Sequence, residues 1–170
     1  MPTQIQISRG YSVTVDDEDV SFVTQWKWTA LPTKWTVYAR RNKTSEGKQH
    51  SVYLHRELMN RPPGLTVDHI DRNGLNCTRA NMRLATPSEN QRNKGLRSTN
   101  TSGVIGVSWS KISRKWQAII GIHYKQIHLG FFDDIVDAAK AYREASEKHH
   151  GEFATHLSRP TQAIPDAEPR

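Results

Sequence analysis

The chain has 170 residues, a formal net charge of +7 and a pI near 9.7. That length allows one domain or two small ones with modest cores, and the surplus of positive charge suits a polyanionic partner. One cysteine, Cys77, excludes a disulfide framework and a multi-cysteine zinc site within one chain. No apolar run approaches the ~20 residues that span a membrane. Met1–Gly10 also lacks the apolar core of a signal peptide, so we expect a soluble, cytoplasmic protein.

Residues 1–54 predict a β-rich region. Residues 4–15 alternate loosely in strand fashion around a turn at Gly10, and the acidic run 16–19 is typical of the start of a short helix.

A hairpin follows within this region, with strands over 35–41 and 51–54 and a turn between them. Basic residues gather near its tip, and a basic two-stranded ribbon fits the DNA major groove. A solvated hairpin is the open alternative. The candidate DNA contacts here are Arg40 and Arg41.

A strand–loop–strand–helix unit is predicted next. Thr66–Ile70 is a short β-branched run and predicts a strand, which Asn73-Gly74 ends as a turn. Residues 83–85 predict a second strand. Residues 86–89, Thr-Pro-Ser-Glu, then predict a helix start with an N-cap, a proline in the first helical position and a capping box. A helix over 55–59 precedes this unit.

Four polar residues of this unit lie at intervals that suit phosphodiester hydrolysis. Asp68 and His69 are adjacent, and Asn81 and Asn90 follow His69 at intervals of 12 and then 9 residues. A hard divalent cation needs oxygen ligands, which Asp68 and the side chain of Asn90 can supply. His69 can take a proton from an attacking water, and Asn81 can hold the imidazole in one tautomer. The open alternative is a satisfied surface histidine beside two turn asparagines.

The pattern VDHID…N…ANMRLATPSENQRNK over residues 67–94 closely resembles the HNH (ββα-metal, or His-Me finger) nucleases, especially the homing endonucleases of phage introns. The resemblance implies Asp68 and Asn90 as metal ligands, His69 as the general base and Asn81 as the residue that orients it. It departs from many members in having Asn90 where they have histidine, and in lacking zinc-binding CxxC pairs. It implies double-stranded DNA as the substrate, Mg²⁺ as the cofactor with Mn²⁺ also supporting activity, no zinc, and the cytoplasm of a bacterial host cell. The His-Arg pair at 55–56 resembles one on the helix that precedes this core, so we expect a structural or phosphate-contacting role for His55.

Residues 97–102 have linker composition. From Asn90 through Phe132 the chain has no acidic residue and seven basic ones, and such a concentration favours a nucleic-acid contact over a solvated face, which usually mixes signs.

The residues after the linker predict three antiparallel strands, over 104–109, 116–122 and 125–131, followed by a helix that Asp133-Asp134 caps. With one sheet face covered by the helix, the other is expected to carry Trp109, Trp116 and basic side chains. Residues 157–170 look like a frayed tail.

Residues 103–154 resemble the DNA-binding domain of plant ethylene-response factors. The matching motifs are GV at 106–107, KW at 115–116, LGFF at 129–132 and the helix DAAKAYREAS…HG. The usual arginine positions of that family hold other residues here, so the resemblance implies the fold and not the plant target sequence. The candidate DNA contacts in and around this unit are Arg92, Lys94, Arg97, Trp109, Lys111, Arg114, Lys115, Trp116, Gln117 and Lys125.

These features together predict an α+β protein that acts as a metal-dependent, site-preferring DNA endonuclease of the homing type, nicking one strand per site as a monomer. The alternatives are a DNA-binding regulator with a relict nuclease core and a non-specific defensive nuclease. The predicted layout is a β-rich region (1–54), an HNH ββα-metal core (55–96), a linker (97–102), an ethylene-response-factor-like domain (103–156) with a three-stranded antiparallel sheet packed on one helix, and a tail (157–170).

Overall fold

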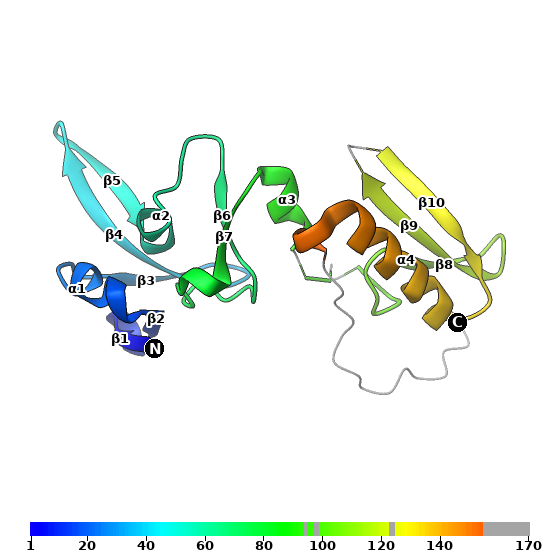
Figure 1. The fold of residues 1–170 in the computed structure, drawn as a ribbon, viewed down its shortest axis with the longest axis horizontal. Helices are drawn as coiled ribbons and strands as arrows, with labels where there is room; N and C mark the ends of the chain where they lie inside the picture. The colour runs from blue at the N-terminus through cyan, green and yellow to red at the C-terminus, as the bar shows by residue number, and fades with distance from the viewer. Residues whose placement is uncertain (94, 97–98, 123–124, 155–170) are drawn as a thin grey trace. The chain divides into compact units, whose positions relative to one another are not determined.

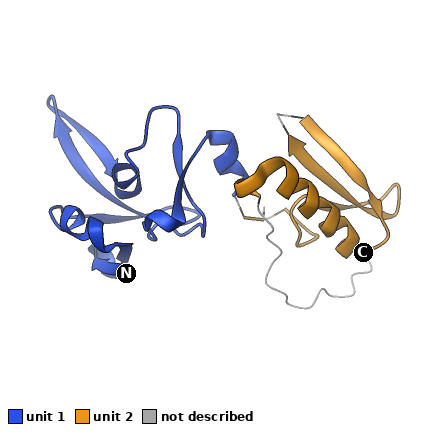
Figure 2. Cartoon of the chain, viewed as in Figure 1, with its two compact units in different colours: residues 1–93 blue, residues 94–170 orange. Residues whose placement is uncertain are grey.

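The computed structural model describes residues 1–93, 95–96, 99–122 and 125–154. The chain divides into two compact units, Met1–Asn93 and Lys94–Arg170 (Figure 2). Both units combine antiparallel sheets with helices (Figure 1), which confirms the α+β class. Within the described residues, no helix combines the length and the apolar character needed to cross a membrane. The predicted tail lies outside the described residues.

Unit 1 begins with the predicted alternating strands, β1 (Pro2–Gln6) and β2 (Ser12–Asp16), which pair antiparallel around a 3-10 turn, η1 (Ser8–Gly10). The alternation has a plain cause, since every second residue of β2 points into the core. The acidic run then forms the 3-10 turn η2 (Asp17–Asp19) and leads into a single helical turn, α1 (Val20–Val23).

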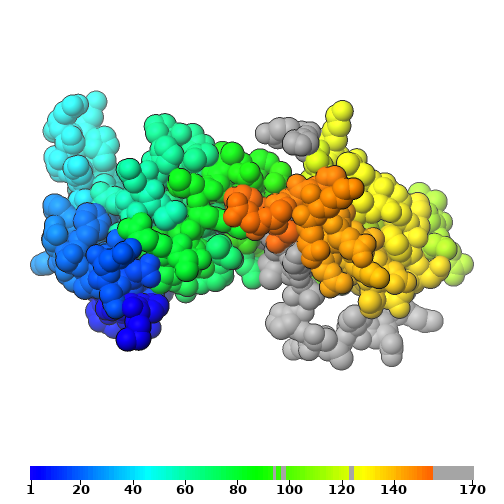
Figure 3. All heavy atoms as spheres, in the orientation of Figure 1, coloured from blue at the N-terminus to red at the C-terminus, as the bar shows by residue number. Residues whose placement is uncertain are grey.

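The second sheet of unit 1 has the strand order β3–β4–β5. β4 (Val37–Ser45) and β5 (Lys48–Tyr53) form the predicted hairpin, but the strands extend further and leave only Glu46 and Gly47 in the turn. Both turn residues have positive φ, as two-residue hairpin turns that match the strand twist require. The tip of the hairpin is exposed over residues 42–50 and stands clear of the rest of unit 1 (Figure 3). β3 (Thr29–Pro32) was not predicted.

The predicted strand–loop–strand–helix order is confirmed. A short helix, α2 (Leu54–Leu58), precedes it. The capping box at the start of the last helix forms as predicted, because Thr86 Oγ1 accepts from Glu89 N and Glu89 Oε2 accepts from Thr86 N. The elements are β6 (Thr66–His69), η3 (Arg79–Asn81), β7 (Met82–Ala85) and α3 (Pro87–Arg92).

The N-terminal sheets and the ββα elements share one hydrophobic core, which contains Val13, Leu54, Cys77 and Met82. The loop between β6 and β7 is joined to β2 by backbone hydrogen bonds, from Thr14 N to Leu75 O and from Cys77 N to Thr14 O, both 2.8 Å. The residues on the two sides of position 54 therefore fold around a common interior.

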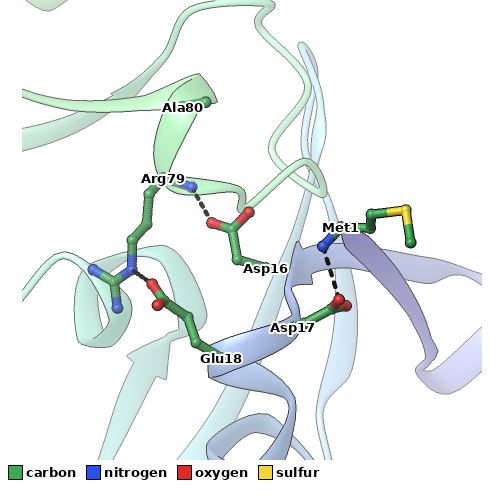
Figure 4. A pocket seen from close by; sticks show the side chains of 6 residues that line it. All are labelled: Met1, Asp16, Asp17, Glu18, Arg79 and Ala80. Carbon is green, nitrogen blue, oxygen red and sulfur yellow. Dashed lines mark hydrogen bonds and ion pairs between the residues drawn. The ribbon is translucent and has the colours of Figure 1, made fainter.

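Arg79 makes a second connection between the two parts of unit 1 (Figure 4). Its backbone N donates to Asp16 Oδ2 at 2.7 Å, and its guanidinium donates to Glu18 at 2.9 Å and Asp19 at 2.8 Å. Asp16 and Glu18 line an open pocket beside the N-terminus, where the amino group of Met1 pairs with Asp17. The acidic run thus anchors the turn that leads into β7.

Unit 2 contains a three-stranded antiparallel sheet of order β10–β9–β8 covered by the helix α4. Asp134 caps α4 by accepting a hydrogen bond from Val136 N, as its position predicted. The core of unit 2 is small and apolar, and its buried residues are Val107, Ala118 and Ala138. The ring of Tyr142 lies against Gly106, whose positive φ and lack of a side chain permit this approach. The elements are β8 (Val107–Ser110), β9 (Lys115–Ile122), β10 (Lys125–Phe132), α4 (Ile135–His150) and η4 (Gly151–Phe153).

Candidate active site and nucleic-acid interface

Asp68 is a buried carboxylate on β6, 4% exposed. It faces Arg83 across the β6–β7 ladder, and both Nε and Nη2 of Arg83 bond to its Oδ2, at 2.9 and 2.8 Å. Its Oδ1 accepts from Asn93 Nδ2 at 2.8 Å. A buried carboxylate is costly unless it is paired and hydrogen-bonded, and these two partners hold it in a fixed orientation.

His69 follows on the same strand and points to the other face, as strand geometry requires. Its ring, 6% exposed, contacts the rings of His55 and Tyr38 at centroid distances of 5.1 and 6.0 Å. Its Nε2 lies 3.9 Å from Cys77 Sγ. Burial lowers the pKa of His69, partly opposed by the carboxylates of Asp71 and Asp68. The imidazole is therefore neutral at pH 7, the state that a general base needs.

Asn81, predicted to orient the imidazole, makes its hydrogen bonds elsewhere. Its Oδ1 accepts from Asp71 N at 3.0 Å, and its Nδ2 donates to Asp71 Oδ1 at 2.9 Å and to Asn76 O at 2.8 Å. Its backbone carbonyl accepts from Ile70 N. Asn81 thus fixes the loop that follows β6, and any effect on His69 passes through that loop.

Asn90 is half-buried on α3, and within the part of the chain that the structure describes its side chain makes no hydrogen bond. Asn93, just past the end of α3, contacts Asp68 instead. The Nδ2 of Asn93 donates to Asp68 Oδ1, and it also donates to the backbone carbonyl of His69 at 2.7 Å. The structure therefore adds a third asparagine to the two that the pattern indicated.

The residues present fit a divalent cation bound through oxygen. A carboxylate offers about four acceptor positions, and the three contacts from Arg83 and Asn93 leave Oδ1 of Asp68 with a free lone pair. The amide oxygen of Asn90 is uncommitted among the described residues. No group of three or more His, Cys, Asp or Glu side chains suited to a metal occurs in those residues.

One of the two hairpin arginines predicted to contact DNA is buried inside unit 1. Arg41, predicted to contact DNA, is 8% exposed and bonds to both carboxylate oxygens of Glu57 at 3.1 Å. Its guanidinium also lies over the rings of Trp26 and Trp28. Arg41 is thus a structural residue whose guanidinium is engaged within unit 1. Arg40 is half-buried and donates to Ser51.

The open face of the unit 2 sheet does not carry all the residues that the sequence predicted for it. Trp109 and Trp116 are directly opposed in the β8–β9 ladder and pack edge to face at 5.2 Å. By strand alternation they share a face with Val107 and Ala118, which belong to the core, and Trp116 packs against that core. The expectation that both tryptophans lie on the free face is therefore wrong.

The other predicted contacts of unit 2 are placed as follows. Gln117 is on the open face and donates to Ser108 Oγ, while Lys115 pairs with Asp133 at 3.1 Å. Lys111 and Arg114 are exposed in the β8–β9 turn, and Lys125 is exposed at the start of β10. Arg92 is half-buried on α3. Lys94 and Arg97 lie outside the described residues.

Four residues near the active site carry contacts that the sequence interpretation did not assign. Arg83 could have been found from hairpin register, because it lies opposite Asp68. Cys77 and Asn93 carry no such local signal, and for His55 the sequence predicted a structural or phosphate-contacting role but not its contact with His69. His55 is 5% exposed, and burial, then the neighbouring His69, lowers its pKa to about 3. Cys77 is fully buried, and its Sγ lies beside the imidazole of His69.

Comparison with known proteins identifies a family for this chain. The HNH endonuclease family matches residues 60–92. The chain is 41% identical over 93 residues to Protein 3.8 of Escherichia phage T7, which covers 55% of this chain and 76% of that protein. It is 36% identical over 96 residues to the uncharacterized HNH endonuclease L560 of Acanthamoeba polyphaga mimivirus, covering 55% of this chain and 47%, about half, of that protein. No solved structure matches. The chain therefore belongs to the family of phage T7 Protein 3.8 and carries an HNH endonuclease domain at residues 60–92.

Proposed function

We propose that this chain is a divalent-metal-dependent DNA endonuclease with site preference. The observation that carries the proposal is the pairing of Asp68 and His69 on consecutive residues of β6. One is a carboxylate held by Arg83 and Asn93, and the other is a buried, neutral imidazole. Both lie within the segment that matches the HNH endonuclease family.

His69 acts as the general base in this mechanism. Its imidazole takes a proton from the water that attacks the phosphorus atom, and the bond from phosphorus to the leaving oxygen breaks. Because His69 is neutral at pH 7, it can accept that proton without first losing one. Arg83 and Asn93 keep the Asp68 carboxylate from rotating, so that its free lone pair stays aimed in one direction.

Asp68 and Asn90 would hold the metal ion. When bound, a divalent cation supplies Lewis-acid stabilisation of the charge that develops on the phosphate and the leaving oxygen. Mg²⁺ is usually bound through only one or two carboxylates, keeps several waters and binds substrate phosphates. We therefore expect Mg²⁺ as the cofactor, with Mn²⁺ as a substitute.

One active site per chain supports nicking of one strand. The opposite strand presents its phosphate elsewhere and with reversed polarity, so a single docking event uses the metal and base once. We infer a nicking monomer of the homing type. We also infer that it acts in the cytoplasm of a bacterial host, and the relative from Escherichia phage T7 supports this location.

Site preference is assigned to unit 2, as its resemblance to the ethylene-response-factor domain suggests. Its apolar core lets it fold around its own interior, and the exposed side chains of Lys111, Arg114 and Lys125 can reach phosphates. Phosphate contacts position a protein on DNA, while base contacts give sequence preference. The polar pair Gln117–Ser108 on the open sheet face is the candidate for base contacts.

The test is incubation of the purified chain with supercoiled plasmid and Mg²⁺, followed by mapping of breaks on both strands. We expect nicked circles at preferred positions, no cutting in excess EDTA, and no cutting by Asp68→Ala, which should still bind DNA. The matched control is Asp137→Ala, because Asp137 is an exposed carboxylate on α4. Full cutting in EDTA would contradict the metal mechanism, and linear product without a nicked precursor would contradict nicking.

A further inference from the structure

The imidazole of His69 is enclosed on the side away from Asp68. His55 and Tyr38 contact its ring, and they also contact each other at a centroid distance of 5.1 Å. These ring contacts restrict the position of the imidazole, but they do not decide which ring nitrogen carries the proton. That choice is made by the hydrogen-bond partner of one of the two nitrogens.

The only ring hydrogen-bond partner of His69 among the described residues is Cys77, whose Sγ lies 3.9 Å from Nε2. The sulfur also lies 3.7 Å from the carbonyl oxygen of Gly74, to which its S–H can donate. When the thiol donates its hydrogen to that carbonyl, the sulfur lone pairs are available to its other neighbour, and the sulfur can accept from Nε2–H. Burial raises the pKa of Cys77 to about 12, which keeps the thiol protonated for this role.

The position of Cys77 is fixed from two sides. Its side chain is fully buried in the core of unit 1, and its backbone N donates to Thr14 O at 2.8 Å. The loop before it is fixed by Asn81, through Asp71 and Asn76. The hydrogen bonds of the Asn81 side chain are made to Asp71 and Asn76, and among the described residues none joins it to the imidazole of His69.

We propose that Cys77 is a positioning residue for the nuclease reaction. It accepts the hydrogen of His69 Nε2, and this leaves Nδ1 as the unprotonated nitrogen that takes the proton from water. The role in catalysis rests on the proposed function, but the tautomer of His69 is a property of the free protein and can be measured without DNA or metal.

The test compares Cys77→Ala with Cys77→Ser. Serine keeps an acceptor at this position and alanine does not, while both remove the sulfur. Val13→Ala is the matched control, since it shortens another fully buried side chain of the same core that has no hydrogen bond to His69. Urea unfolding of each variant reports the stability change, and ¹⁵N NMR of the labelled histidines in the free protein reports which nitrogen of His69 carries the proton.

We expect the wild type, Cys77→Ser and Val13→Ala to keep the proton on Nε2. Cys77→Ala leaves a buried Nε2–H without an acceptor, which favours moving the proton to Nδ1. Its plasmid-nicking kcat should fall about tenfold, corresponding to about 1.4 kcal/mol, while its DNA affinity stays unchanged and Cys77→Ser recovers most of the rate.

Either of two results would overturn the proposal. One is a proton on Nδ1 of His69 in the wild-type protein, and the other is equal tautomers and equal rates in Cys77→Ala and Cys77→Ser. If Cys77→Ala fails to fold, the tautomer in the wild type and in Cys77→Ser still decides the question. A wild-type protein with Nε2–H on His69 and no nuclease activity would count against the proposed function and not against the contact with Cys77.

Discussion

The two units of this chain differ in what they bury. Unit 1 encloses charged and polar side chains that include Arg41, His55, Asp68, His69 and Asn93, whereas the buried polar residues described in unit 2 are Ser146 and His150 on one helix. Buried polar groups cost stability unless they are paired, and their clustering with shifted pKa values is typical of functional sites. The difference indicates that unit 1 carries the chemistry, while unit 2 presents its polar groups on exposed turns around an apolar core.

The largest loss of nuclease activity is expected when His69 in unit 1 is replaced. His69→Ala should lower the nicking rate by about 10²–10⁴-fold, the usual contribution of a positioned general base. Asn81→Ala should cost less, because Asn81 acts through the loop it fixes. The matched control is His149→Ala, an exposed histidine at the end of α4. The measurement is single-turnover cleavage, and a folded His69→Ala protein with wild-type rates would contradict the mechanism.

The pH profile of cleavage adds a second readout at His69. The base must be unprotonated, so activity is lost as pH falls through the pKa of His69. Burial places that pKa below the ordinary 6.5. We therefore expect the acid limb of the rate profile to lie below pH 6.5.

The two ion pairs, Arg41–Glu57 in unit 1 and Lys115–Asp133 in unit 2, should differ in the stability lost when one partner is removed. Arg41 is 8% exposed, and its loss leaves a partly buried carboxylate, so Arg41→Ala should cost about 3–5 kcal/mol. Lys115 is 44% exposed and its partner 86%, so Lys115→Ala should cost about 0–1 kcal/mol. Urea unfolding of both variants measures the difference, and equal losses would show that burial does not distinguish the pairs.

The buried His55 should make unit 1 sensitive to acid. Its pKa is about 3 in the folded protein and near 6.5 when unfolded. The unfolded state binds the proton more tightly, so the neutral His55 contributes no penalty above pH 6.5 and destabilises the fold as pH falls below it. Between pH 7 and pH 5 the loss should be about 2 kcal/mol. Urea unfolding of His55→Phe should show a smaller loss over this range, and an identical loss would remove His55 as the cause.

The smallest effect is expected on the exposed turns of unit 2. Each phosphate contact contributes about 0.9 to the log–log salt slope of DNA binding. Replacing both Lys111 and Arg114 by alanine should therefore lower that slope by about 1.8. The matched control is Lys140→Ala with Arg143→Ala, which removes two exposed charges from α4. Equal slopes for the two double variants would show that the β8–β9 turn does not contact the DNA backbone.

The sequence by itself determined the elements that depend on near neighbours. The capping box at Thr86 and the β6–loop–β7–α3 order were predicted, because turns, caps and strand alternation act over a few residues. The same holds for the β4–β5 hairpin and for the cap of α4 by Asp134. The Asp68–His69 pair was also indicated by its motif, since a motif records residue types at fixed spacing.

Only the tertiary structure decided which partners the polar side chains meet. Cys77 reaches His69 because β2 fixes the loop between β6 and β7, and Arg41 is buried because Glu57 and two tryptophans surround it. Trp116 faces the core because of its register with β8, and that face was not evident from its position in a basic, aromatic segment. These contacts join residues from separate elements, and the free energy of burying a polar group depends on the partner it finds there.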